Sequence, residues 1–433
     1  MLVGFVSNWK RTYWVVWTAN LITSIGMMSF LPFFPSLLEE LGVQGQASVA
    51  AWSGICFAAA PLTATFSSPL WGVLGDRFGR KIMVCRAMLA IAFFVGGMGF
   101  VTAPWQLLVL RMLQGTFSGF IPPSITLVSV AAPADRQGRI AGNLTTALAV
   151  GGLIGPLFGG LAATVLGSHQ GVFFLVGGLA LAAALLVWFG AEEVPGMRLQ
   201  NEASTSPAAV MRQTMADLRK VLESPALRST VMLVFGLQIG LGAINPLIEL
   251  YVRELFHGVE HQGTWLAGLA NLFQEETSDG QLSSRVETVA TSLLFGAMAV
   301  ANLVSLSPWG RHGDRVGHQR ALIQCAIVCI LALLTQWAAA VYLVLLLGRL
   351  LLGIGMAGVG PLAFGLAAGE ASVDRRGGAF GVVFSARTLA VAMGGTLGGL
   401  VYPLIGVRGV MLASALIVAL ALLFFGRNTR AMR

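Results

Sequence analysis

The chain has 433 residues, of which 56% are hydrophobic and 11% are charged, and its formal net charge is +8. A soluble domain carries about 25% charged residues, so this composition excludes an ordinary soluble protein and indicates an integral membrane protein. Most lysines and arginines fall on one side of the predicted spans. The positive charge therefore sets membrane orientation and does not indicate nucleic-acid binding.

Twelve apolar runs are long enough to cross a bilayer, whose hydrocarbon core of about 30 Å needs about 20 helical residues. The runs are continuously apolar and do not alternate, which excludes a transmembrane β-barrel. The first run lacks a small-residue cleavage site, so it is expected to stay as a span. Basic loops predict a multi-pass protein of the cytoplasmic (inner) cell membrane with both termini in the cytoplasm. We place the spans at 13–37, 50–70, 83–103, 105–131, 140–165, 171–190, 229–250, 288–308, 320–338, 341–368, 378–401 and 407–426.

The first span predicts a bent helix beside a central path. Pro32 and Pro35 interrupt it just before an acidic pair at 39–40. Proline near the end of a membrane helix frees backbone groups, which are tolerated beside a cavity or a partner helix. The alternative is a bent helix that serves packing alone. Asn245 and Pro246 repeat this layout in the seventh span.

The segment between the second and third spans concentrates glycine and charge in a short predicted turn. It reads Gly72-Val-Leu-Gly-Asp76-Arg77-Phe-Gly79-Arg80-Lys81, and Gly72 and Gly79 are expected to allow positive φ. The pattern resembles the cytoplasmic loop between the second and third spans of major facilitator superfamily transporters. That resemblance implies a conformational gate, in which Asp76 caps the N-terminus of the eleventh span and latches the cytoplasmic side shut. A solvated turn that only marks the membrane surface is the alternative.

Three other charged residues belong to the predicted gate. Asp135, in the loop after the fourth span, is the expected partner of Arg77. Asp314 and Arg315 form a degenerate copy of the motif, 238 residues after Asp76 and Arg77. Arg80 and Lys81 are expected to serve orientation and lipid contact.

The same offset of 238 residues relates Arg111 to Arg349 and Pro123 to Pro361. Markers that repeat in register predict an internal duplication. We therefore expect an all-α fold of twelve transmembrane helices in two pseudo-symmetric six-helix bundles, related about an axis along the membrane normal.

The predicted domains are residues 1–191 and 229–433, joined by a cytoplasmic linker at 192–228. The linker is polar and proline-rich and then basic with helical periodicity, which predicts a short amphipathic helix on the inner leaflet. An insert near 257–287 lengthens the second half on the outer face. An amphipathic helix and a disordered lid are both compatible with its sequence.

Arg111 lies within the fourth span, and Arg349 and Arg387 lie within the tenth and eleventh. An arginine facing lipid costs several kcal/mol, so each must face the interior, water or a carbonyl partner. In the superfamily that the chain resembles, the arginine matching Arg111 is linked to proton handling. The structural alternative is that backbone carbonyls alone accept the hydrogen bonds of these arginines.

The fifth span runs Gly151-Gly-Leu-Ile-Gly155-Pro156-Leu-Phe-Gly159-Gly160. Glycines at this spacing form a stripe that lets a partner helix approach closely. With the proline, the pattern resembles the antiporter signature of drug/proton exporters. Generic packing would explain the glycines by themselves.

Proton exchange generally uses a carboxylate inside the membrane, and no Asp or Glu falls near the middle of a predicted span. Glu249 comes closest, near the outer surface. Proton coupling through Arg111 and Glu249 is thus an expectation from resemblance. The residues expected to line the substrate cavity are mostly flexible or aromatic, which suits varied apolar molecules. They are Asn20, Met27, Phe30, Phe34, Phe117, Gln238, Asn245, Phe295, Met298 and Arg387.

His257, Glu260 and His261 follow the His-x-x-Glu-His order of some zinc peptidases. Gly258 interrupts this segment as a helix, and the chain offers no independent domain to build a cleft. A membrane zinc enzyme is therefore a remote alternative, and we expect no metal site.

Taken together, the chain resembles the twelve-span drug/proton antiporter branch of the superfamily. The resemblance implies a monomeric exporter of hydrophobic or amphipathic small molecules that exchanges them for protons by alternating access, with no cofactor and no enzymatic activity. The same scaffold moving a lipid, a siderophore or a sugar, including uptake, is the main alternative.

Overall fold

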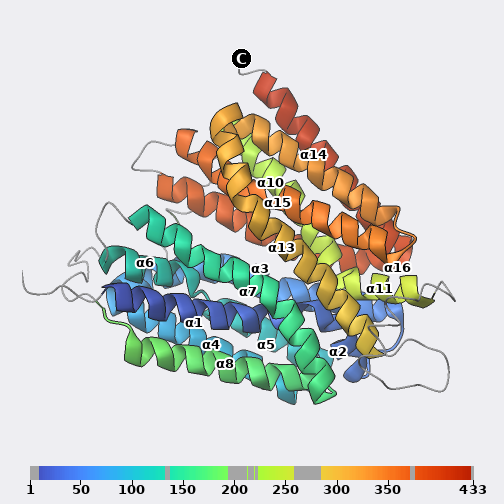
Figure 1. The fold of residues 1–433 in the computed structure, drawn as a ribbon, viewed down its shortest axis with the longest axis horizontal. Helices are drawn as coiled ribbons and strands as arrows, with labels where there is room; N and C mark the ends of the chain where they lie inside the picture. Colours follow the sequence, from blue (N-terminus) through green and yellow to red (C-terminus); the bar gives the residue numbers. More distant parts are fainter. Residues whose placement is uncertain are drawn as a thin grey trace, which may run out of the picture.

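The structure is a computed structural model that describes residues 9–131, 137–193, 212, 219, 223–257, 284–370 and 376–430. Every secondary-structure element among these residues is a helix. Figure 1 shows the helices of the first half, blue to green, gathered in one lobe and those of the second half, yellow to red, in another.

The first half consists of eight α-helices and two short 3₁₀ turns that make six spans. In chain order they are α1 (Trp9–Ser29), η1 (Leu31–Phe33), α2 (Phe34–Glu40), α3 (Gln46–Phe78), α4 (Arg80–Gly97) with η2 (Met98–Phe100), α5 (Pro104–Phe117), α6 (Ile121–Ala131), α7 (Gln137–Leu166) and α8 (His169–Gly190).

The second half repeats this order, with the single helices α15 and α16 in place of the pairs α5–α6 and α7–α8. Its elements are α10 (Pro225–Ile244), η4 (Asn245–Leu247), α11 (Ile248–His257), α13 (Ser284–Val316), α14 (His318–Trp337), α15 (Tyr342–Glu370) and α16 (Arg376–Arg430). The predicted linker and outer insert fall almost entirely outside the described residues.

Ten helices among the described residues are long and apolar enough to cross a membrane. One of them is most of α16, where Gly406 has a φ of 67° and breaks the helix into two spans. A further span is formed by α5 and α6, which are interrupted at residues 118–120 and are too short to cross separately. This count agrees with the twelve predicted spans.

The prolines interrupt the first and seventh spans where the sequence predicted. Pro32 lies in the 3₁₀ turn η1 between α1 and α2, and Pro246 lies in the 3₁₀ turn η4 between α10 and α11. Proline lacks the N–H that an α-helix needs at these positions, so the chain tightens into a 3₁₀ turn and then resumes the helix. The two halves therefore bend at equivalent points.

The glycine-rich segment at 72–81 differs from its predicted form. Residues 72–78, including Asp76 and Arg77, belong to the last turns of α3, and only Gly79 leaves the helix. The N–H of Gly79 still donates to the carbonyl of Gly75, at 3.1 Å, so helical bonding continues up to the turn. Gly72 is helical, whereas Gly79 has a φ of +103°, which only glycine adopts readily.

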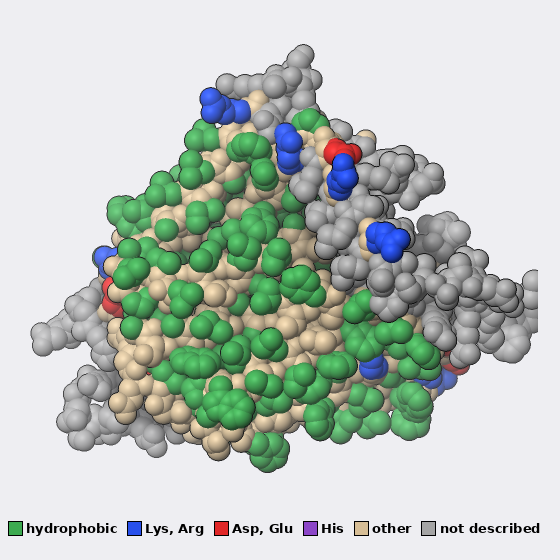
Figure 2. All heavy atoms as spheres, turned by 180° about the vertical axis from the view of Figure 1, so that it is seen from behind, with side chains coloured by type: hydrophobic (Ala, Val, Ile, Leu, Met, Phe, Trp, Pro, Cys, Tyr) green, Lys and Arg blue, Asp and Glu red, His purple; other side chains and the backbone are tan. Residues whose placement is uncertain are grey.

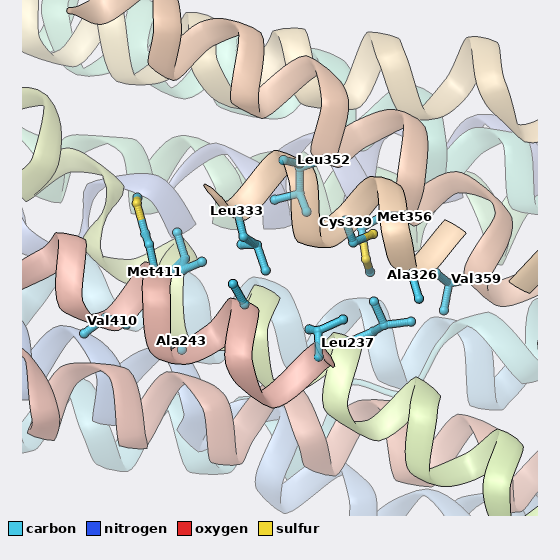
Figure 3. Packing of buried hydrophobic residues seen from close by; sticks show 14 of the residues in the cluster. Leu237, Ala243, Ala326, Cys329, Leu333, Leu352, Met356, Val359, Val410 and Met411 are labelled. Atoms are coloured by element: carbon cyan, nitrogen blue, oxygen red, sulfur yellow. The ribbon is translucent and has the colours of Figure 1, made fainter. Parts of the chain in front are cut away.

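Each half has its own apolar core. In the second half, α10, α14, α15 and α16 interdigitate around Leu237, Cys329, Leu333 and Met411, and Figure 3 shows these side chains from close by. A separate cluster in the first half contains Val16, Met88, Ile91 and Phe173. The two clusters share no buried residue, although the cluster of the second half also includes Val49 and Ala50 of α3.

The two halves pack most extensively along two pairs of helices, α3 with α16 and α7 with α13. Gly54 of α3 lies against Gly395 and Gly399 of α16, with backbone on backbone. Gly160 of α7 lies against the side chain of Ser292 in α13. Side chains this small allow the close approach of membrane helices.

The outside of the molecule carries large apolar side chains. Figure 2 shows them spread over the described part of one face, with the few charged side chains toward its margins. Phe93, Phe100, Phe189 and Leu404 are each more than 70% exposed, which would be costly in water. A lipid environment accounts for this surface.

Candidate substrate cavity and gates

A cavity of about 640 Å³ lies between the two halves and is walled by both. Its lining is mostly apolar and runs along α3 from Phe57 to Trp71, a distance of about 21 Å at 1.5 Å per residue. Polar groups interrupt the wall at a few points, including Arg111, Gln114 and Asn245. A space of this size and character suits an amphipathic small molecule.

We call the end of the molecule that carries α2 and α11 the α2 end, and the opposite end, with the turns at Gly79 and Gly317, the Gly79 end. The cavity reaches Trp71, which is seven residues from the last residue of α3 at the Gly79 end. At the α2 end, its wall stops at Leu31, Pro32 and Asn245.

The structure places the predicted cavity residues in two groups. Met27, Asn245, Phe295 and Met298 line the cavity. The other six lie outside its wall because they pack between helices. Asn20 accepts a hydrogen bond from Ser124 within the first bundle, Phe30 and Phe34 stack beside Arg111, Phe117 contacts Trp71 and Phe94, and Gln238 faces Arg387.

Arg111 is 2% exposed, and each nitrogen of its guanidinium donates a hydrogen bond. Nε donates to the carbonyl of Cys56 at 3.1 Å, Nη2 donates to the carbonyl of Phe57 at 3.3 Å, and Nη1 donates to Oε1 of Gln114. The Phe30 and Phe34 rings lie 5.6 and 5.4 Å away, within the range of cation–π attraction. The carbonyls belong to α3, so Arg111 ties α5 to α3.

Arg349 is the counterpart of Arg111 in the second half and is 0% exposed. Nη1 donates to Oδ1 of Asn245 at 3.1 Å, and the guanidinium lies 4.9 Å from the Phe295 ring. Its Nε and Nη2 have no hydrogen-bond partner among the described residues. Arg349 therefore donates fewer hydrogen bonds than Arg111.

Two indole hydrogen bonds repeat across the duplication. Trp71 Nε1 donates to the carbonyl of Thr116 at 2.6 Å, and Trp309 Nε1 donates to the carbonyl of Ile354 at 2.7 Å. Donor and acceptor are each displaced by 238 residues. The sequence analysis did not single out these tryptophans, although the shared offset could have identified them.

The α2 end is closed by charged side chains that join the two halves. Arg253 of α11 donates to both carboxylate oxygens of Glu39 in α2, at 2.6 and 2.7 Å, and to Oγ of Ser36 at 2.7 Å. It also donates to Glu249 at 3.1 Å, and its Nε lies 3.2 Å from Glu287 of α13. We call this set of five residues the Arg253 cluster.

Glu249 is 1% exposed within this cluster. It accepts hydrogen bonds from the backbone N–H of Ser36, at 3.2 Å, and from the Ser36 hydroxyl. Because Ser36 belongs to the first half and Glu249 to the second, the α2 end cannot open without breaking these bonds. Sequence reasoning placed Glu249 near this surface but missed Arg253, since nothing in the local sequence shows that three carboxylates converge on it.

The predicted gate residues lie at the Gly79 end, and the structure describes only some of their side chains. The side chains of Asp76 and Arg77 are outside the described part, as is the whole of Asp135. The backbone N–H of Arg80 donates to Glu193 at 2.6 Å, so a carboxylate that follows α8 meets the N-terminus of α4. This contact was absent from the sequence interpretation.

Lys81, Asp314 and Arg315 were also predicted to belong to the gate, and they lie on the molecular surface at the same end. Lys81 lies 5.8 Å from the Trp188 ring. Asp314 and Arg315 are exposed, and Asp314 lies 3.7 Å from His318 one turn later.

The glycines of the fifth span pack against the first span. A Cβ at Gly151, Gly155 or Gly159 would clash with Ser24, Met28 or Ser29 of α1. Pro156 lies inside α7 and lines the cavity.

The described residues do not include the full set of side chains that the zinc-enzyme alternative requires. Glu260 and His261 lie outside the described residues, and His257 is the last residue of α11, with an undescribed side chain. Among the described residues, no group of three His, Cys, Asp or Glu side chains could hold a metal ion.

A helical membrane protein with two related bundles around a central cavity has the architecture of a secondary transporter. The sequence model of the Major Facilitator Superfamily matches residues 16–274 and 280–432, and the chain belongs to this superfamily of transporters.

Two relatives match almost the whole chain. It is 30% identical to the multidrug resistance protein MdtG of Yersinia enterocolitica over 415 residues, which cover 95% of this chain and 91% of the relative. It is 29% identical to the multi-drug resistance efflux pump PmrA of Streptococcus pneumoniae over 423 residues, which cover 96% of each.

Solved structures with the same fold diverge further in sequence. The nucleoside transporter NupG has a TM-score of 0.74 at 12% identity, and the match covers 96% of this chain and 99% of NupG. A D-xylose–proton symporter has a TM-score of 0.71 at 16% identity, with 96% and 97% covered. These likenesses confirm the predicted fold class.

Proposed function

We propose that the protein exports hydrophobic or amphipathic small molecules by alternating access, in exchange for protons. The observation that carries the proposal is the asymmetry of the cavity. It runs toward the Gly79 end, while the Arg253 cluster closes the α2 end. The apolar lining and the names of the multidrug relatives support the substrate class.

The positive-inside rule assigns the Gly79 end to the cytoplasm, because most basic residues lie there. The structure then corresponds to a state that accepts substrate from the cytoplasm or the inner leaflet. In the opposite state, the motif from Gly72 to Lys81, together with Asp135, Asp314 and Arg315, would close this side. Rocking of the two bundles about the α3–α16 and α7–α13 contacts would connect the states.

The proposed proton site is the Arg253 cluster. Three carboxylates, from Glu39, Glu249 and Glu287, surround one guanidinium. When all three are ionised the cluster carries an excess of negative charge, which is costly at the buried positions of Glu249 and Glu287. A proton arriving from outside would relieve that excess and weaken the contact between the halves, with Glu249 as the most buried acceptor.

Transport in everted membrane vesicles tests the proposal. Vesicles that contain the protein should accumulate amphipathic drugs when a proton gradient is imposed, and an uncoupler should abolish accumulation. Drug accumulation that is unchanged by the uncoupler would disprove proton exchange. Accumulation in right-side-out vesicles, and none in everted ones, would indicate uptake.

A drug-sensitivity panel in an efflux-deficient host gives the second test. The intact protein should lower sensitivity to several unrelated amphipathic compounds, whereas Asp76→Asn and Arg111→Ala should not. Glu249→Gln should retain drug binding but lose the response to the proton gradient. Equal protection by Glu249→Gln and the intact protein would remove Glu249 from proton coupling.

A further inference from the structure

The two charged side chains considered at the cavity, Arg111 and Arg349, are both positive. Among the described residues that line it, Arg111 is the one charged side chain and none is acidic. Arg349 lies directly behind the wall. In the sequence, every Asp and Glu falls near the ends of the predicted spans or outside them, so no membrane-embedded carboxylate offsets these arginines at mid-depth.

Arg349 contacts the cavity through three residues that line it. Nη1 donates to Asn245 at 3.1 Å and lies 3.5 Å from Sδ of Met298, and the Phe295 ring lies 4.9 Å from the guanidinium carbon. One layer of three side chains, of which only Asn245 is an amide, therefore separates the charge from the cavity on this side.

The guanidinium of Arg349 also retains hydrogen-bonding capacity. Nε and Nη2 are buried and have no hydrogen-bond partner among the described residues. A buried donor left unpaired is costly, and a guanidinium pairs best with an anionic group that accepts two hydrogen bonds. Arg111 differs because carbonyls and Gln114 already occupy its donors.

We propose that the cavity prefers anionic amphipathic substrates over cationic ones, with the acidic group at Asn245 and Arg349 and the apolar body extending toward Trp71 and Phe384. This inference rests on the proposed export function and specifies its substrate class. Low polarity strengthens the attraction of an anion to Arg349 and the repulsion of a cation. The apolar part of the wall remains tolerant of shape.

Two probe ions that differ mainly in charge sign test the preference. Tetraphenylborate and tetraphenylphosphonium have nearly the same size and shape. Equilibrium binding of each to the purified full-length protein would be measured in one detergent. We expect tetraphenylborate to bind at least tenfold more tightly, which corresponds to about 1.4 kcal/mol.

Variants identify the source of the preference. Arg349→Met should bring the ratio of the two affinities close to one, and Arg349→Lys should keep it. Arg311→Met removes an exposed arginine away from the cavity and should leave the ratio unchanged. Because Arg349→Met removes a buried group and can impair folding, Asn245→Asp provides a second route. Its carboxylate would neutralise Arg349 and reduce the ratio at least tenfold.

The outcomes separate the two proposals. Equal or tighter binding of tetraphenylphosphonium to the intact protein would overturn the anion preference and leave the export proposal standing. A ratio unaffected by both Arg349→Met and Asn245→Asp would also overturn it. Binding of neither ion, together with no protection in the drug panel, would overturn both.

Discussion

The two halves of the molecule share a scaffold and differ in how it is used. Gly159 of α7 packs on the carbonyl of Ser29 in α1, and Gly398 of α16 packs on the carbonyl of Ala243 in α10. The glycine stripe of the fifth span thus has a structural equivalent in the second half. Its glycines are explained by helix packing that both halves need.

What differs between the halves lies at the cavity. Pro156 lines the cavity in the first half, and α16 has glycine at the matching position, 395. Arg111 is fully bonded within its bundle, whereas Arg349 has a single oxygen partner. The comparison teaches that the contacts shared by the two halves hold the bundles together, while the contacts that differ between them are the candidates for transport.

Substituting the equivalent glycines should have the largest effect and the same effect in each half. A Cβ at Gly159 or Gly398 would clash with a backbone carbonyl, so Gly159→Ala and Gly398→Ala should each destabilise by about 1–3 kcal/mol. The apparent Tm of the purified protein measures this. Gly152→Ala, with nothing within 4 Å of its Cβ, is the control and should change little. A fall in Tm for only one of these two variants would show that Gly159 and Gly398 are not structurally equivalent.

Arg253→Gln should come next in size and should act on the contact between the halves. Removing the guanidinium takes the positive charge away from Glu249 and Glu287, while Ser36 still donates to Glu249, so the state closed at the α2 end should lose about 1–2 kcal/mol. We expect a cysteine at position 245 to react faster with a membrane-impermeant maleimide added outside. The four native cysteines are buried and give a low background. Unchanged labelling would show that the cluster does not hold this end closed.

Lysine substitutions should separate Arg111 from Arg349. Lysine cannot reach three acceptors in the plane that a guanidinium spans, so Arg111→Lys should lower transport at least tenfold. Arg349→Lys retains the charge and loses one hydrogen bond, so a change of twofold or less is expected. Initial rates in vesicles, corrected for protein amount, measure both. Equal losses would mean that the two arginines act alike.

Pro156→Ala should affect transport more than stability. The proline has no equivalent in α16 and lines the cavity, and alanine restores a backbone N–H inside the helix. We expect transport to fall severalfold while the Tm stays the same or rises. A drop in Tm comparable to that of Gly159→Ala would place Pro156 among the packing residues.

The smallest effects are expected for the paired tryptophans. Trp71→Phe and Trp309→Phe each remove one hydrogen bond to a carbonyl, which is worth about 1 kcal/mol. Both should lower stability by that amount. Trp71 lines the cavity and Trp309 does not figure in its lining, so only Trp71→Phe should also alter drug affinity. Altered affinity in both would extend the cavity to Trp309.

The sequence by itself determined the spans, the duplication and the bends at Pro32 and Pro246. These features follow from local rules, namely apolar length, the offset of 238 residues and the missing N–H of proline. It also located the turn at Gly79, although residues 72–78 proved to be helical because hydrogen bonding continues to Gly79.

Only the tertiary structure decided which side chains meet. Glu39 and Glu287 converge on Arg253 from helices far apart in the chain, and Phe30 and Phe34 pack beside Arg111 although the sequence suggested that they face the cavity. Periodicity gives the face of a helix but not the neighbour that covers it. The charge balance at the α2 end and around the cavity depends on those neighbours, which is why it emerged only from the folded molecule.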